Sequence, residues 1–224
     1  MKFRHEYKFF INYSDYLTLR SRLGQIMKMD KNVGNSNEYK IRSLYFDNIY
    51  DKALNEKING FDNREKFRIR CYNNDFTFIK LEKKSKINGL CNKVSCPITK
   101  EECIKILNND LDWMLNSKFD LIKELYIKMK TQLLKPKVLV DYTREPFIYE
   151  AGNVRITLDR NIKTGMNEIN LFNLESPTII AGESLILVEV KYDEYLPEII
   201  KKTLNLKNRT RTSYSKYEVC RIFG

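Results

Sequence analysis

Hydrophobic and charged residues alternate along several short segments of the chain, and the alternation is most regular between residues 64 and 86. The sequence there reads REKFRIRCY, NND and FTFIKLEKKSK. Arg68 and Arg70 lie on one parity, and the apolar residues around them lie on the other. Because successive side chains of a strand point to opposite faces, this pattern predicts two strands, residues 64–72 and 76–86, joined by the turn-forming NND.

The same division recurs near the N-terminus and twice after residue 150. In each segment the charged residues share one parity, and most apolar residues occupy the other. At least five predicted strands therefore have a charged face. Outside the first pair of strands, the residues on these charged faces are Arg4, Glu6 and Lys8 in one strand, Arg155 and Asp159 in a second, and Glu189 and Lys191 in a third.

The remaining segments predict further strands and several helices. Ser14 is a candidate N-cap, Gly60 a candidate C-terminal cap, and Thr99 with Glu102 a capping box. Since no linker or repeat divides the sequence, we expect residues 1–224 to form a single α+β domain with mostly antiparallel strands. The further strands are expected within residues 3–11, 39–47, 91–98, 137–150, 153–162 and 184–192, and the helices within 14–27, 48–60, 99–107, 117–134, 196–205 and 213–223.

The charged strand faces allow two interpretations. One is an antiparallel sheet with one face on a core and one face in water. The other is a closed barrel with a wet interior, lined by cations and dotted with carboxylates. Arg, Lys and Glu dominate these faces, where solvent-exposed strands would also use Thr, Ser and Gln, and this favours the barrel. The direction of Arg144 stays open, because it shares a parity with the apolar Val138 and Val140.

The net charge also bears on the partner. Forty Lys and Arg against twenty-nine Asp and Glu give a formal charge of +11. This excess is typical of proteins that bind nucleic acid, an anionic membrane surface or a phosphate-rich molecule, although a basic surface without a partner would look the same. A cation-lined interior needs a multiply charged anion to offset its own repulsion. Carboxylates in such a place could hold Mg²⁺ or Mn²⁺, and the candidates are Glu6, Glu82, Asp159 and Glu189.

Several classes of protein are disfavoured. The five cysteines contain no C-x-x-C pair, so small buried side chains are expected, with a zinc site at Cys91, Cys96 and Cys103 as the alternative. No apolar run is long enough to span a bilayer and the N-terminus does not read as a signal peptide, so a cytoplasmic protein is expected. No nucleic-acid-binding motif is present.

Eight fragments of the sequence, taken in order, resemble the VTC-type polyphosphate polymerase domain, a member of the triphosphate tunnel metalloenzymes. They cover about residues 2–222 and read RHEYKF, SLYFDN, REKFRIRCY, IKLEKKSK, YTREPF, VRITLD, LVEVKY and SKYE. The resemblance implies an eight-stranded antiparallel tunnel with helices packed outside it. The tunnel would bind ATP, triphosphate or polyphosphate together with a divalent metal, Mn²⁺ or Mg²⁺.

The resemblance also implies roles for individual residues. Glu189 matches the metal-binding glutamate, with Glu6 and Glu82 as its helpers, while Asp159 is a candidate metal ligand from the strand pattern alone. Lys216 matches a lysine that a C-terminal helix presents to the tunnel. The expected phosphate ligands are Lys8, Arg68, Arg70, Lys80, Lys84, Lys93, Arg144, Arg155, Lys191 and Lys216, of which Arg68, Arg70, Lys80, Arg144, Arg155 and Lys216 are the candidate catalytic residues.

One departure from the wider superfamily is informative. The superfamily opens with Glu-x-Glu-x-Lys, and Arg4 stands here in place of the first glutamate. This favours the polyphosphate-polymerase branch over relatives that act on thiamine triphosphate or make cyclic AMP. Three hypotheses follow: synthesis of polyphosphate from the γ-phosphate of ATP, hydrolysis of tripolyphosphate or nucleoside triphosphates in the same tunnel, and binding of polyphosphate or nucleic acid without chemistry.

Overall fold

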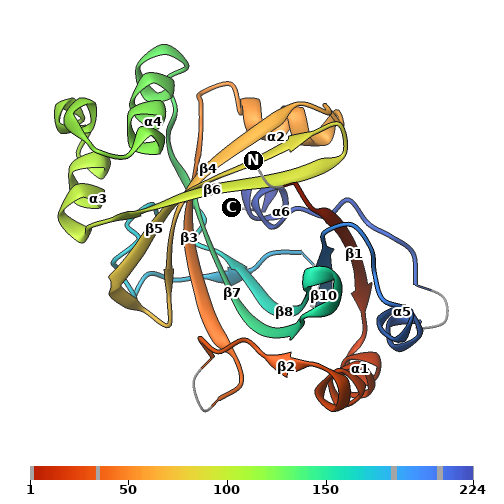
Figure 1. Ribbon diagram of the computed structural model, residues 1–224. Coiled ribbons are helices and arrows are strands. Elements are labelled where there is room, and N and C mark those ends of the chain that lie inside the picture. The colour runs from red at the N-terminus through yellow and green to blue at the C-terminus, as the bar shows by residue number, and fades with distance from the viewer. Residues whose placement is uncertain (1–2, 34–35, 183–185, 206–208, 224) are drawn as a thin grey trace.

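One continuous antiparallel sheet dominates the computed structural model, which describes residues 3–33, 36–182, 186–205 and 209–223. Eight of its strands follow each other in the order β1-β10-β8-β7-β3-β4-β5-β6, while the short strands β2 and β9 pair with β7 and β8 (Figure 1). The bounds are β1 His5–Ile11, β2 Lys28–Met29, β3 Tyr39–Asp47, β4 Arg64–Tyr72, β5 Asp75–Ile87, β6 Leu90–Ile98, β7 Lys135–Tyr149, β8 Val154–Thr164, β9 Ile179–Ile180 and β10 Ile186–Tyr192.

The two outer strands of this order meet at one point. The backbone N–H of Arg4 donates to the carbonyl of Cys91 at 3.1 Å, and the N–H of Cys91 donates back at 3.2 Å. This bridge joins the start of β1 to β6, so the curled sheet closes on itself as a barrel. The predicted fold class, an α+β protein built on an eight-stranded antiparallel tunnel, is confirmed.

Tight turns connect the charged strands. Asn88 and Gly89 between β5 and β6 have φ angles of 47° and 80°, as expected for an Asn-Gly hairpin turn. Asn73 and Asn74 between β4 and β5 have φ angles of 52° and 58°, and asparagine tolerates this left-handed region better than most residues. These turns fix the register in which Arg68 stands directly opposite Glu82.

Helices pack around the sheet largely as the sequence predicts (Figure 1). The capping box of Thr99 and Glu102 is present. The predicted cap at Ser14 is wrong, because the Asn12 side chain accepts the N–H of Asp15 at 2.8 Å and so begins the helix earlier. The α-helices are α1 Tyr13–Ile26, α2 Lys52–Ile58, α3 Lys100–Leu107, α4 Asp120–Thr131, α5 Glu198–Leu204 and α6 Lys216–Ile222, and the 3₁₀ turns are Asp112–Asn116 and Ala151–Asn153.

Three apolar clusters hold the helices in place. The first packs α3 and α4 against the outside of β3, β4, β5 and β6, and the second packs α1 and α5 against β1, β8 and β10. In the third, Tyr217 and Cys220 of α6 contact Val138 and Val140 of β7, and all four are at most 1% exposed. Since these β7 residues share the parity of Tyr142 and Arg144, α6 covers an apolar part of the barrel's inner face.

None of the helices in the described ranges is both long enough and apolar enough to cross a membrane.

Candidate functional site

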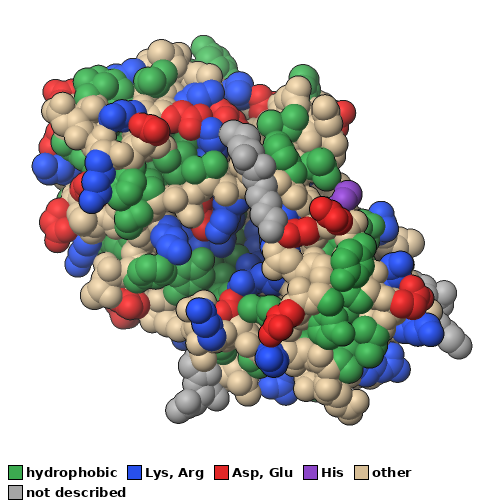
Figure 2. Space-filling model, in the orientation of Figure 1, with side chains coloured by type: hydrophobic (Ala, Val, Ile, Leu, Met, Phe, Trp, Pro, Cys, Tyr) green, Lys and Arg blue, Asp and Glu red, His purple; other side chains and the backbone are tan. Residues whose placement is uncertain are grey.

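A cavity of about 940 Å³ occupies the barrel, and its wall is strongly basic. Figure 2 shows Lys and Arg side chains within the hollow at the centre of this face. Four Asp or Glu residues line the cavity, against fifteen Lys or Arg. The basic residues are Arg4, Lys8, Lys57, Arg64, Lys66, Arg68, Arg70, Lys80, Lys84, Lys86, Lys93, Arg144, Arg155, Lys191 and Lys216.

All ten residues expected to bind phosphate line this one cavity. They come from β1, β4, β5, β6, β7, β8, β10 and α6, so nearly every wall contributes. The strand pairing also brings like charges directly opposite each other: Arg70 faces Lys80, and Lys84 faces both Lys66 and Lys93. Like charges at such positions destabilise a sheet, and a bound polyanion would relieve that cost.

Glu82 of β5 is the counter-charge of one wall. Its carboxylate lies 2.7 Å from Arg68, 2.9 Å from Lys93 and 3.6 Å from Arg70, and the residue is fully buried. Burial alone would raise the pKa of Glu82, but the attraction of these three cations outweighs it and lowers the pKa far below the usual range. Glu82 is therefore ionised at all ordinary pH values.

Tyrosine and serine hydroxyls complete the positioning of the two arginines. Arg68 donates to the Tyr45 hydroxyl at 2.7 Å. Arg70 donates to Ser43 Oγ at 2.9 Å and to the Tyr142 hydroxyl at 3.0 Å. These bonds use part of each planar guanidinium and fix the direction of the rest.

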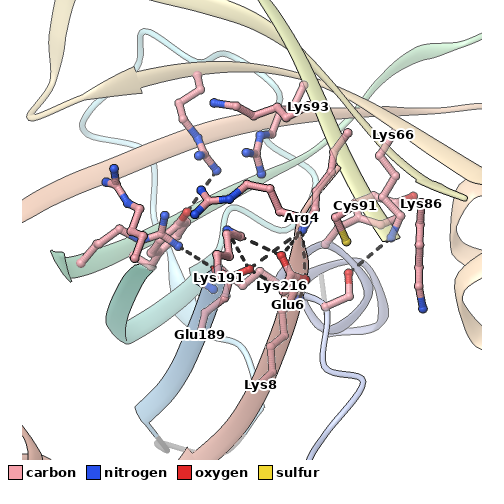
Figure 3. Close-up of a pocket in the computed structure, with 18 of the residues that line it drawn as sticks. Arg4, Glu6, Lys8, Lys66, Lys86, Cys91, Lys93, Glu189, Lys191 and Lys216 are labelled. Carbon is pink, nitrogen blue, oxygen red and sulfur yellow. Dashed lines mark hydrogen bonds and ion pairs between the residues drawn. The ribbon is translucent and has the colours of Figure 1, made fainter. Parts of the chain in front are cut away.

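A second group combines two neighbouring carboxylates with three lysines. Glu6 of β1 lies 3.0 Å from Lys8 and 2.9 Å from Lys84, while Glu189 of β10 lies 3.1 Å from Lys191. Each lysine also approaches the other carboxylate, at 3.6 to 3.9 Å. Figure 3 shows Glu6, Lys8, Glu189 and Lys191 pointing toward one another from the two paired strands.

The charges of this group shift the pKa values of its members. Burial opposes ionisation of Glu6, yet Lys84 and Lys8 outweigh burial and lower its pKa to about 2. For Glu189, too, burial is outweighed, first by Lys191 and then by Lys8, so its pKa lies well below the usual range. Burial lowers the pKa of Lys191 to about 8, in spite of the two carboxylates.

Asp159 of β8 stands apart from that pair and is fully buried. It accepts two hydrogen bonds from Arg144, at 2.6 and 2.7 Å, and lies 2.6 Å from Lys216 of α6. Arg144 also reaches Glu189 at 3.3 Å. The direction of Arg144, open from the sequence, is thus inward, and its apolar parity partners face inward as well because α6 covers them.

The four candidate metal ligands do not form one cluster. Glu6 and Glu189 are neighbours, whereas Glu82 is held by arginine and lysine elsewhere on the wall. Asp159 is paired with Arg144, which also contacts Glu189. Among the described residues, no three His, Cys, Asp or Glu side chains are grouped closely enough to hold a metal ion. The pair of Glu6 and Glu189 still suits Mg²⁺ or Mn²⁺, since these ions take one or two carboxylates and complete their shell with water and substrate phosphates.

The cysteine alternative receives no support from this arrangement. Cys96 and Cys103 are buried in the apolar cluster outside the barrel, whereas Cys91 lines the cavity. All five cysteines have free thiols, and burial raises the pKa of the Cys103 thiol most strongly, as expected of an inert core residue.

Sequence reasoning missed Lys66, which lies inside the cavity. Its ammonium lies 3.3 Å from Ser215 Oγ and 4.6 Å from the centre of the Tyr217 ring. Burial lowers its pKa to about 7. The signal was available, because Lys66 shares the parity of Arg68 and Arg70.

Comparison with solved structures shows the same fold at low sequence identity. The PH1012 protein of Pyrococcus horikoshii OT3 is 16% identical, with a TM-score of 0.53 over 96% of this chain and 98% of that one. A conserved hypothetical protein of Pyrococcus furiosus is 15% identical, with a TM-score of 0.52 over 96% and 99%. The PH1819 protein of Pyrococcus horikoshii OT3 is 15% identical, with a TM-score of 0.50 over 96% of both chains. Comparison with curated proteins gave no match.

Comparison with family models identifies the family of the chain. The model of the VTC domain matches residues 3–222, which is nearly the whole chain. It confirms the resemblance to the VTC domain that the eight sequence fragments carry. The chain belongs to the VTC domain family.

Proposed function

We propose that the protein is a metal-dependent phosphotransferase that moves the γ-phosphoryl group of ATP onto a growing polyphosphate chain. The observation that carries the proposal is the cavity wall, where fifteen basic residues surround the adjacent carboxylates of Glu6 and Glu189. A multiply charged, flexible anion is the ligand that best offsets such a wall. A cytoplasmic location, where ATP is available, belongs to the same proposal.

The arginines would grip the triphosphate. Arg68 and Arg70 are already oriented by Glu82 and by hydroxyl groups, so little further ordering is needed when a phosphate binds. Lys80 and Lys93 extend the same wall, and Arg144 and Arg155 face the cavity from β7 and β8. Donors fixed in this way stabilise the charge that spreads over the phosphoryl oxygens in the transition state.

Glu6 and Glu189 would hold the divalent metal, which neutralises charge on the phosphate oxygens when it is bound. Lys8, Lys84 and Lys191 lie beside these carboxylates and would contact the same phosphates. Glu82 and Asp159 serve in this proposal as fixed counter-charges for the arginines.

The transfer needs no side-chain nucleophile. A terminal oxygen of the acceptor polyphosphate attacks the γ-phosphorus, the bond to the bridging oxygen breaks, and ADP leaves with the electron pair. The chain grows by one phosphate per ATP. The protein's part is to hold both anions in line and to offset their mutual repulsion.

Purified protein with ATP and Mn²⁺ tests the proposal. Acid-labile polyphosphate should accumulate together with ADP, and Arg70→Ala should abolish it. Arg22→Ala, on the exposed face of α1, is the matched control and should leave the yield unchanged. Production of free phosphate without polymer would refute synthesis.

The second candidate is a tripolyphosphatase or nucleoside triphosphatase that uses the same residues with water as acceptor. The size of the cavity, about 940 Å³, favours it as an alternative because a bound triphosphate would leave room for water. A time course with tripolyphosphate as the only substrate separates the two: steady release of phosphate supports hydrolysis, and longer chains support transfer. Tight polyphosphate binding with no turnover of either substrate would instead indicate a binding module.

A further inference from the structure

The two ends of the β4–β5 hairpin give the cavity two chemically different ends. At one end Arg64 stands opposite Lys86, and Lys66 opposite Lys84. At the other end Tyr72 stands opposite Asp75, close to the turn. All six residues line the cavity, so the difference belongs to the cavity itself.

Phe78 is the unusual residue at the second end. Of the described residues that line the cavity, it is the one large hydrophobic side chain that is mostly exposed, at 51%. Its ring lies 6.5 Å from the ring of Tyr72, at an angle of 39°, and Tyr72 in turn packs edge-on against Tyr39. A flat, partly apolar ligand that covered this ring would remove its apolar surface from water.

The same end is less suited to a phosphate chain. The carboxylates of Asp30 and Asp75 line it, and Asp30 is already paired with Arg155 at 2.7 Å. Asp75 accepts hydrogen bonds from the backbone and hydroxyl of Thr77 through one oxygen, which leaves a negative charge at the opening. Polyphosphate would be repelled there, whereas a neutral nucleoside would not.

Lys80 links this end to the phosphate-binding wall. Its ammonium lies 4.6 Å from the centre of the Phe78 ring, and Lys80 stands opposite Arg70 in the sheet. A triphosphate held by Arg70 and Lys80 therefore ends beside the ring of Phe78, where the ribose and base of a nucleotide would follow.

We infer that Phe78 and Tyr72 form a platform on which the base of the nucleotide substrate stacks, so that ATP enters the tunnel with its nucleoside at the β4–β5 turn. This inference rests on the proposed function for its substrate class. Stacking depends little on which base is present, so the platform adds affinity for nucleotides in general over inorganic triphosphate.

Binding measured without turnover tests the platform. The ligands are the β,γ-imido analogue of ATP and inorganic tripolyphosphate, each titrated into the protein by calorimetry. Phe78→Ala should lower the affinity for the nucleotide analogue by about tenfold or more and change the affinity for tripolyphosphate by no more than about twofold. Tyr50→Ala, which removes a ring that is 74% exposed and does not line the cavity, is the matched control and should change neither affinity.

A second variant separates stacking from support of Lys80. Phe78→Trp keeps a flat ring and should bind the nucleotide analogue at least as tightly as the natural protein. The inference is overturned if Phe78→Ala weakens both ligands equally, if it weakens neither, or if Phe78→Trp binds the analogue as poorly as Phe78→Ala. Because binding does not require catalysis, an inactive protein would refute the proposed function and leave this test intact.

Discussion

Glu82 and the pair of Glu6 and Glu189 are carboxylates buried among the cations of one barrel, yet they are held differently. Two arginines and a lysine approach Glu82, which is fully buried. Only lysines lie between Glu6 and Glu189, apart from the contact of Arg144 with the second. Arginine forms directional, paired bonds, whereas lysine acts as a compact charge that other cations can replace.

The difference teaches that a carboxylate in a basic tunnel can have either of two roles. Glu82 orients the arginines, and its loss would leave the buried Arg68 and Arg70 facing each other without a counter-charge. Glu6 and Glu189 repel one another, and the lysines between them offset that repulsion. A divalent ion bound by both carboxylates could offset it in the same way. Four predictions follow from this contrast, from the largest expected effect to the smallest.

Glu82→Ala should destabilise the protein most, by about 3–5 kcal/mol, because it leaves buried cations without their counter-charge. Denaturant unfolding measures the loss. Added tripolyphosphate should restore more stability to this variant than it adds to the natural protein, since it supplies the missing negative charge. An unchanged free energy of unfolding would show that Glu82 is not the counter-charge that its contacts indicate.

Glu189→Gln should reduce the turnover of the folded protein by about 10²-fold or more, because a metal contributes several kcal/mol to stabilising charge in the transition state. The measurement is the rate of ATP consumption against Mn²⁺ concentration, compared with Glu82→Gln in the same assay. If the rate of ATP consumption depended on Mn²⁺ concentration equally in the two variants, Glu189 and Glu82 would not differ in their relation to the metal.

Affinity for tripolyphosphate should fall by about tenfold between pH 7.5 and pH 9.5. Burial gives Lys191 a pKa of about 8, so its positive charge is present below that pH and is lost above it. Its neighbours Glu189, Glu6, Lys84 and Arg144 keep their charges over this range.

Lys191→Arg is the control for that fall, since arginine stays protonated throughout. Its affinity should change much less with pH. Lys66, with a pKa of about 7, has already lost most of its charge by pH 8 and contributes mainly at lower pH. A fall of the same size in the arginine variant would exclude Lys191 as its cause.

Tyr45→Phe should have the smallest effect, a loss of about 1 kcal/mol in stability together with a modest rise in the KM for triphosphate. It removes one hydroxyl that accepts a hydrogen bond from Arg68 but leaves the bond to Glu82. Thermal unfolding and steady-state kinetics measure the two changes. A loss as large as that of Glu82→Ala would mean that the hydroxyl, and not the carboxylate, positions Arg68.

Alternation of charged and apolar residues predicted most of the barrel, because each strand buries its apolar parity against a helix outside. It failed at β7, where Val138 and Val140 face inward together with Arg144. The reason is tertiary: α6 brings Tyr217 and Cys220 against that part of the inner face, so both faces of the strand are apolar there. Nothing within the sequence of β7 reveals this neighbour.

The ten predicted phosphate ligands all line the cavity, whereas the contacts that they make there were not predicted. Parity and family resemblance together identified the ten cations that meet in the cavity. They could not separate Glu82, bound by arginines, from Glu6 and Glu189, because strand parity carries no information about which charges meet across the barrel. Strand parity could have identified Lys66. It could not identify the hydroxyl of Tyr142, because the sequence of β7 does not show which of its faces points into the barrel.

Binding of Mn²⁺ in the presence of tripolyphosphate tests the central claim most directly. Electron paramagnetic resonance of free Mn²⁺ gives the affinity without any need for turnover. The account predicts that Glu189→Gln weakens Mn²⁺ binding by about tenfold or more, while Glu82→Gln leaves it nearly unchanged. Loss of Mn²⁺ binding in Glu82→Gln, with normal binding in Glu189→Gln, would contradict it.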